Sequence, residues 1–166
     1  MIVNVKPTKS FPFVNLVLLT LFIVGLSFDA EAQKTIDNPI VITIERTACF
    51  GSCPVYSAQI YADGTVNYEG KDFVKITGKK QHKISKEKLN DLIKEFEQAK
   101  YFTLKDKYAS DENGMSLTDQ PTTTTSFTLN GKQKTVVNYY YAPKELEKLE
   151  NAIDLLAGLY EFIGPQ

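Results

Sequence analysis

The chain has 166 residues and a formal net charge of −1, because 19 Lys and Arg residues are balanced by 20 Asp and Glu residues. This balance argues against a nucleic-acid partner, since proteins that bind nucleic acid carry a strongly basic surface. A chain of this length can bury the core of one domain without help from a metal ion.

The first residues have the pattern of a secretory signal peptide. Lys6 and Lys9 provide positive charge, and residues 11–28 are mainly apolar. Ala30-Glu31-Ala32 then matches the pattern that precedes a cleavage site, in which two small residues flank one residue of any type. The pattern predicts that the protein is exported.

Cleavage is predicted between Ala32 and Gln33, so that residues 1–32 form the signal peptide and residues 33–166 form a single domain. A retained membrane anchor is the alternative, but the uninterrupted apolar part, residues 16–28, is short for a span of ~20 residues. No cysteine lies near the cleavage site to accept a lipid. We therefore expect a periplasmic or secreted protein with no stable membrane insertion after cleavage.

The exported domain begins with alternating strands. Every second residue of 40–45 is isoleucine, which is typical of a half-buried strand. Residues 55–61 and 65–69 then form a hairpin. A three-residue loop with a left-handed Gly64 places Ile60 opposite Val66, and this pairing of two apolar residues favours that loop length.

A fourth strand and a helix follow this hairpin. Residues 73–77 and 81–84 are expected to form one strand that bends at Gly78. Ser85 is typical of a helix N-cap, and the apolar residues between 89 and 99 recur at helical spacing. We expect this helix to cover one face of the sheet.

A second hairpin is predicted after a long polar loop, residues 105–121. Residues 122–128 and 132–139 have strand composition, and a three-residue loop with a left-handed Gly131 would place Phe127 opposite Gln133.

The last predicted element is a helix that starts at Pro143 and stops at Gly164. The apolar residues of this helix form one stripe: Leu146, Leu149, Ile153, Leu156 and Tyr160. The order is therefore four strands, a helix, two strands and a helix. This order predicts an α+β fold, in which an antiparallel sheet of about six strands has two helices packed on one face.

Both cysteines lie in the segment between the first two strands. Cys49 and Cys53 are expected to form a disulfide, because exported proteins fold under oxidising conditions. Closing so short a ring stabilises the fold by only about 2 kcal/mol in the chain-entropy model. The bond would fix the bend between the strands, and Pro54 would stiffen its exit.

A redox-active pair is the alternative for these cysteines. Such pairs usually have two intervening residues and lie at a helix N-terminus, whereas Cys49 and Cys53 have three and a strand follows them. The two cysteines and His82, the single histidine, match no zinc spacing. The sequence thus indicates no metal, no cofactor and no catalytic residues. It leaves enzymatic activity open, and it favours a protein that is not an enzyme.

These residues also carry a resemblance to a known family. The match begins with residues 45–56, Glu-Arg-Thr-Ala-Cys-Phe-Gly-Ser-Cys-Pro-Val-Tyr, and continues in residues 60–66, 68–70 and 119–122 and in Asn130-Gly131. In these segments the chain resembles the bacterial family known as domain of unknown function 6438. The resemblance implies a small exported protein with no established activity. Many members are lipoproteins, but this chain lacks the lipid-acceptor cysteine.

The hypothesis that best fits the sequence is a non-enzymatic module that binds a protein or a component of the cell envelope. Its binding surface would be the uncovered sheet face or the loops around the cysteines and residues 106–121. One alternative is a thiol redox enzyme or sensor that uses the Cys49–Cys53 pair. Another is an inhibitor-like domain that docks on an enzyme. The candidate surface residues are Arg46, Phe50, Tyr56, Asp119 and Thr122.

Overall fold

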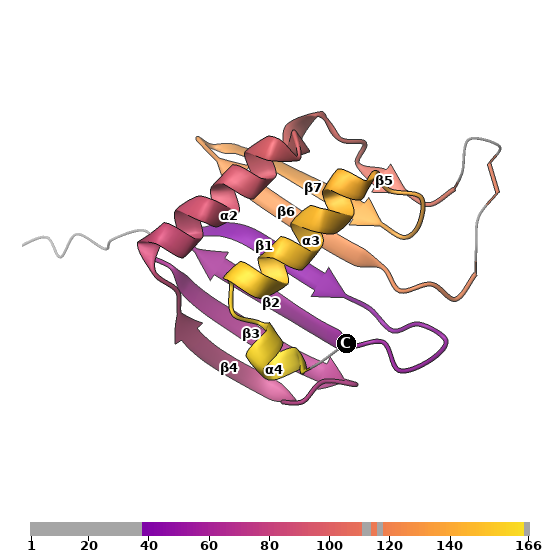
Figure 1. Ribbon diagram of the computed structural model, residues 1–166, viewed down its shortest axis with the longest axis horizontal. Coiled ribbons are helices and arrows are strands. Elements are labelled where there is room, and N and C mark those ends of the chain that lie inside the picture. Colours follow the sequence, from indigo (N-terminus) through magenta and orange to yellow (C-terminus); the bar gives the residue numbers. More distant parts are fainter. Residues whose placement is uncertain (1–37, 111–113, 116–117, 165–166) are drawn as a thin grey trace, which may run out of the picture. The chain divides into compact units, whose positions relative to one another are not determined.

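The computed structural model describes residues 38–110, 114–115 and 118–164, which form a seven-stranded sheet and its helices (Figure 1). The predicted signal peptide and its cleavage site lie outside the described residues. The strands are β1 Ile40–Arg46, β2 Val55–Tyr61, β3 Thr65–Asp72, β4 Gly78–Lys83, β5 Lys107–Tyr108, β6 Thr123–Leu129 and β7 Lys132–Asn138. The helices are α2 Lys86–Gln98, the 3-10 helix η1 Tyr101–Thr103, α3 Lys144–Leu156 and α4 Tyr160–Ile163.

The sheet has the order β4-β3-β2-β1-β6-β7-β5, with β1 at its centre. All pairs are antiparallel except that of β7 with the two-residue strand β5. In Figure 1, α2, α3 and α4 lie across the same face of the sheet. The predicted α+β fold is therefore confirmed, and β5 adds a short strand that the sequence did not indicate. None of the helices in the described part of the chain has the length and apolarity needed to cross a membrane.

The core lies between the helices and the sheet, where alternate residues of the strands point inward. Ile42 and Ile44 of β1 are fully buried, as the isoleucine alternation predicted. The first hairpin also has the predicted register, because Ile60 lies opposite Val66. Gly64 has a φ of 84°, and a Cβ at that position would lie 2.6 Å from a backbone oxygen of Ile84. The left-handed turn therefore requires glycine.

The predicted fourth strand is wrong at its start. β3 continues to Asp72, and β4 begins only at Gly78, so that residues 73–77 form the connection between them. The backbone N–H groups of Lys75 and Ile76 donate to carbonyls of α4 instead of to a neighbouring strand. This contact with α4 could not be foreseen from the local pattern.

The predicted register of the second hairpin is also wrong. Its loop has two residues, Asn130 and Gly131, and both have positive φ, 52° and 75°. This is the conformation of a type I′ turn, whose twist matches that of the flanking strands. Phe127 consequently lies opposite Lys134, and the buried Val136 lies opposite Thr125.

The last predicted helix is interrupted. α3 ends at Leu156, and α4 begins four residues later. Gly158 has a φ of 72°; its N–H donates to the Leu155 carbonyl, and the Leu159 N–H donates to that of Asp154. These two bonds form a Schellman motif, which ends a helix at a glycine. The chain can then turn and place α4 against β3 and β4.

Candidate functional site at the cysteine loop

Arg46, the last residue of β1, is the centre of a largely buried hydrogen-bond network. Its Nε donates to the hydroxyl of Tyr56 on β2 at 2.9 Å, and its two terminal nitrogens donate to Thr123 on β6 at 3.0 Å and to Asp154 on α3 at 2.9 Å. The Tyr56 hydroxyl in turn donates to the other Asp154 oxygen. Four elements that are distant in sequence are thereby joined at one end of the sheet.

The charges in this network compensate one another. Burial alone would lower the pKa of Arg46, but Tyr56 and Asp154 outweigh it and raise that pKa. Burial raises the pKa of Asp154, while the charge and hydrogen bonds of Arg46 and Tyr56 oppose that rise. Burial also raises the pKa of Tyr56, so its hydroxyl stays protonated and remains a donor. The network therefore supports the structure and does not release or take up protons near neutral pH.

A second buried carboxylate lies one helical turn before Asp154. Glu150 is only 4% exposed, and both of its oxygens accept from the Asn138 amide at 3.1 Å. Burial raises the pKa of Glu150 to about 7, and the Asn138 hydrogen bonds and the charge of Arg46 partly offset this effect. Glu150 therefore titrates near neutral pH, in contrast to an exposed glutamate.

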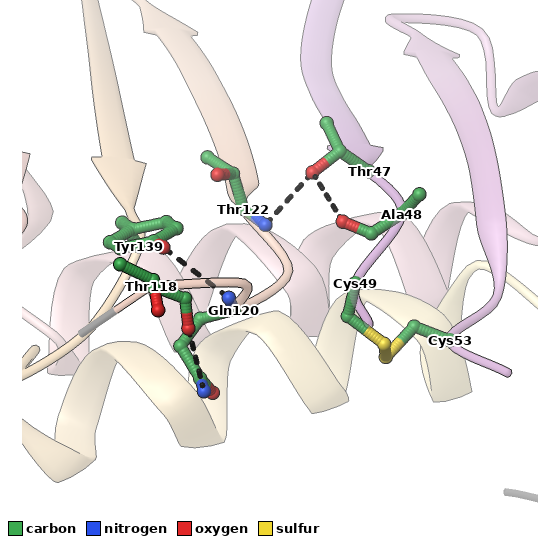
Figure 2. Close-up of a disulfide and its surroundings, with 8 residues drawn as sticks. All are labelled: Thr47, Ala48, Cys49, Cys53, Thr118, Gln120, Thr122 and Tyr139. Atoms are coloured by element: carbon green, nitrogen blue, oxygen red, sulfur yellow. Dashed lines mark hydrogen bonds between the residues drawn. A yellow bond between two sulfur atoms is a disulfide. The ribbon is translucent and has the colours of Figure 1, made fainter. Parts of the chain in front are cut away.

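The segment between β1 and β2, residues 47–54, is called the cysteine loop below. Cys49 and Cys53 form the predicted disulfide, with a Cα–Cα distance of 5.7 Å. Figure 2 shows this bridge together with Thr47 and Thr122, whose hydrogen bond links the loop to the segment that precedes β6. The ring side chain of Phe50 at the loop tip is 92% exposed.

Backbone hydrogen bonds fasten the cysteine loop to residues 118–122. The Thr47 N–H donates to the Thr122 carbonyl at 3.0 Å. In return, the Thr122 N–H donates to the Thr47 hydroxyl at 2.9 Å, as Figure 2 shows. Further along the loop, the Phe50 N–H donates to the Asp119 carbonyl at 3.2 Å. The loop is thus held at its tip as well as at its base.

Arg46 lines two cavities at this end of the sheet. One, of about 390 Å³, lies against the disulfide and is lined by Cys53, Pro54, Tyr56, Asn151, Asp154, Tyr160 and Ile163, with Arg46 and Pro121. The other, of about 470 Å³, is called the tyrosine groove below. It is lined by Gln120, Thr123, Asn138, Tyr139, Tyr140, Tyr141, Ala142, Lys144, Glu147 and Glu150, again with Arg46 and Pro121.

The structure brings the residues of the predicted surface into one region, in different roles. Phe50 and Asp119 are exposed at the tip, and the half-buried Thr122 fastens the loop. Tyr56 is only 1% exposed, so it supports Arg46 from below. Its place in the core follows from the alternation of β2, on which Ala58 and Ile60 face the same way.

Sequence reasoning missed Asp154, Glu150 and Asn138. A signal was present, because Leu146, Glu150 and Asp154 follow one another at four-residue spacing and so share one face of α3. The apolar stripe of this helix made that face a buried one. Two acidic residues on it indicate buried carboxylates that need partners.

The disulfide lies in a loop between two strands, and His82 lies elsewhere in the sheet. The cysteine loop connects two strands, so neither sulfur lies at a helix N-terminus that would stabilise a thiolate. Within residues 38–110, 114–115 and 118–164, no group of three His, Cys, Asp or Glu side chains is placed to hold a metal ion. His82 lies on β4, where its Nε2 donates to the Ala157 carbonyl at 2.7 Å.

Fold and site together define a disulfide-containing α+β domain, in which one end of the sheet carries a loop braced by a buried arginine network. The family model described as domain of unknown function (DUF6438) matches residues 40–157, and the chain belongs to this family. The match covers the whole sheet, the cysteine loop and α3. Comparison with curated proteins gives no match.

Proposed function

We propose that this protein is an exported, non-enzymatic binding domain that docks a protein partner through the cysteine loop. The observation that carries the proposal is the exposure of Phe50 at the tip of a loop that a disulfide and backbone hydrogen bonds hold in place. Large aromatic side chains are common anchors in protein interfaces, where they fill a pocket of the partner.

The rigid support of the loop makes such an anchor effective. Ordering a flexible loop on binding costs free energy, so a loop that is already ordered binds more tightly. The disulfide, the bonds to residues 118–122 and the buried Arg46 network all act on the same short segment. They restrain a loop whose most prominent side chain, Phe50, makes no contribution to the core.

The uncovered sheet face supports this role less well. Its side chains are polar and satisfy one another: Gln81 donates to Asn67, and Asn67 donates to the Tyr61 hydroxyl. A partner that covered this face would have to compensate these polar groups for the hydrogen bonds that they make with one another and with water. The cysteine loop has no comparable polar cover over Phe50.

Export is part of the proposal and rests on the amino-terminal sequence. Residues 1–32 have the charge and the apolar pattern of a signal peptide. A disulfide between Cys49 and Cys53 is compatible with an oxidising compartment such as the periplasm or the outside of the cell. Amino-terminal sequencing of the mature protein tests this part, since it should begin at Gln33.

Site-specific crosslinking in the native host tests the docking surface. Phe50 is replaced by a photoreactive phenylalanine analogue in the full-length chain, and the same analogue replaces Leu155, an exposed apolar residue on α3. After irradiation, we expect a discrete adduct from position 50 and none from position 155. Equal adducts at both positions, or none at position 50, would overturn the proposal.

The identity of the crosslinked partner distinguishes this function from the two alternatives, an inhibitor and a thiol redox protein. A captured enzyme whose activity falls when the purified domain is added would make the protein an inhibitor. The thiol redox alternative predicts instead an adduct that forms through sulfur and is released by a reductant. It also predicts that Phe50→Ala leaves capture unchanged.

A further inference from the structure

The tyrosine groove opens at the same end of the sheet as the cysteine loop. Three consecutive rings, those of Tyr139, Tyr140 and Tyr141, line it from the segment after β7. Glu147 and Glu150 line it from α3. A groove of about 470 Å³ is therefore bounded by aromatic rings from the segment after β7 and by two carboxylates from α3, and Arg46 and Lys144 also line it.

The buried carboxylate of this groove, Glu150, forms no ion pair among the described residues. In the described part of the chain, no Lys, Arg or His nitrogen lies within 4.0 Å of Glu150. Arg46, which also lines the groove, uses its guanidinium on Tyr56, Thr123 and Asp154. A carboxylate has about four acceptor positions. Among the described residues, both oxygens of Glu150 accept from the same donor, the Asn138 amide nitrogen.

The tyrosines are arranged in a way that core packing does not explain. Tyr140 and Tyr141 are 37% and 43% exposed, yet their rings contact each other edge to face with centroids 4.3 Å apart. Tyr141 has a φ of 61°, a left-handed conformation that is unfavourable for an aromatic residue. Strained residues of this kind concentrate at ligand-binding positions.

We propose that the tyrosine groove binds a cationic side chain, arginine or lysine, of the docked protein partner. Ring faces attract a cation through their quadrupole, and the carboxylates of Glu147 and Glu150 supply opposite charge. The inference rests on the proposed function for the source of the cation. The partner would then present an apolar pocket to Phe50 and a basic residue to the groove.

Titration of the isotope-labelled full-length protein with small peptides tests the groove without the partner. The probes are a capped Gly-Arg-Gly peptide, its lysine counterpart and its citrulline counterpart, which is neutral and nearly the same shape as arginine. NMR follows the side-chain amide of Asn138 and the ring signals of Tyr139, Tyr140 and Tyr141. We expect the arginine peptide to shift these signals with an affinity at least about tenfold higher than that of the citrulline peptide.

Variants assign the binding to individual groups. Glu150→Gln should remove the preference for arginine over citrulline, and Tyr140→Ala, at an exposed position, should weaken arginine binding several-fold. Glu145→Gln is the matched control, because Glu145 lies on the same helix, is exposed and does not line the groove. Equal shifts with the citrulline peptide, or arginine shifts confined to other residues, would overturn the inference.

The two proposals fail in distinguishable ways. If the arginine peptide binds the groove but position 50 captures nothing, the cation site stands and the docking function falls. If position 50 captures a partner but the arginine peptide does not bind, the docking function stands and the cation site falls. Loss of the position-50 adduct when Tyr140→Ala is added to the photoreactive chain would show that one partner uses both features.

Discussion

Arg46 is placed where an unpaired charge would be costly. It is half-buried beside the buried Asp154, and the two side chains share Tyr56 as a common hydrogen-bond partner. Replacing a whole buried ion pair by apolar residues often changes stability little, whereas removing one member leaves the other charge without compensation. The network is therefore more sensitive to single than to paired substitutions.

We expect Asp154→Ala to lower the free energy of unfolding by about 3–5 kcal/mol, because it leaves the Arg46 guanidinium buried without its carboxylate. Urea unfolding of the purified protein measures this change. Asp91→Asn is the control, since it breaks an exposed ion pair with Lys94 and should alter stability little. The triple variant Arg46→Met, Tyr56→Phe and Asp154→Leu should recover much of the loss, because it removes the buried Tyr56 hydroxyl together with both charges. A triple variant as unstable as Asp154→Ala would contradict this account.

Glu150 makes stability depend on pH. Its pKa is raised from an ordinary 4.5 to about 7, so the folded chain holds this proton more tightly than the unfolded chain does. The free energy of unfolding should therefore fall as the pH rises from about 4.5 to about 7, by roughly 3 kcal/mol at most from this group. The charged groups that act on it are Arg46, Glu147 and Asp154.

Glu150→Gln tests this dependence, because glutamine keeps the shape but carries no charge at any pH. Urea unfolding between pH 5 and pH 8 should show a smaller loss of stability with rising pH in the variant than in the parent. Glu145→Gln, on an exposed turn of the same helix, should leave the parent profile unchanged. Identical profiles for the parent and Glu150→Gln would show that this carboxylate does not titrate as described.

At the scale of elements, the cysteine loop is held by two independent devices. The disulfide closes a short ring, and the bonds from Thr47 and Phe50 to residues 118–122 attach the same loop to the segment before β6. Loss of the disulfide should therefore loosen the tip of the loop and leave the sheet intact.

We expect the double variant Cys49→Ser and Cys53→Ser to lose about 2 kcal/mol of stability, the value for a short ring in the chain-entropy model. Hydrogen exchange should quicken at the Phe50 amide, and the amides of β2 should remain protected. Reduction of the parent protein should have the same effect, which provides the control. Unfolding of the sheet on reduction would mean that the backbone bonds do not hold the loop.

Elements defined by local interactions were predicted correctly, and a segment defined by long-range contacts was not. The isoleucine alternation of β1 and the Ser85 cap of α2 are local features, and both were predicted correctly. The second hairpin failed because Asn130-Gly131 was assigned a three-residue loop, although this pair is typical of a two-residue turn. Residues 73–77 failed because their backbone partners belong to α4, which lies far along the chain.

In the candidate site, too, the features within one short segment could be predicted, and the contacts between distant elements could not. The disulfide and the exposed Phe50 lie within one short segment, and its sequence pattern indicated both a bend and a surface. The partners of Arg46 come from three other elements, and only the fold shows which acidic residues approach it. The four-residue spacing of Glu150 and Asp154 along α3 did indicate that both lie on its buried face.

At the scale of the whole domain, α4 ties the end of the described chain to the opposite edge of the sheet. The carbonyls of Phe162 and Ile163 accept from the backbone of the β3–β4 connection, and the Phe162 ring packs against Tyr68 and His82. Leu159 and Ile163, at the two ends of this segment, are buried. This segment lies beyond the end of the family match at residue 157.

We expect a chain that stops after Ala157 to fold less stably by at least about 3 kcal/mol, since it loses the burial of Leu159 and Ile163. Hydrogen exchange should quicken mainly in β4 and in residues 73–77, because their contacts with α4 are gone. A chain that stops after Gly164 is the control and should match the parent. Equal stability of both truncated chains would show that α4 is dispensable.

The separation of Arg46 from Asp154 by 108 positions also affects the order of events during synthesis. The guanidinium emerges early, but its carboxylate and the second strand that flanks β1 arrive only with the final third of the polypeptide. Contacts between such distant positions close slowly. The Arg46–Asp154 contact can therefore form only after β6 and most of α3 have been synthesised.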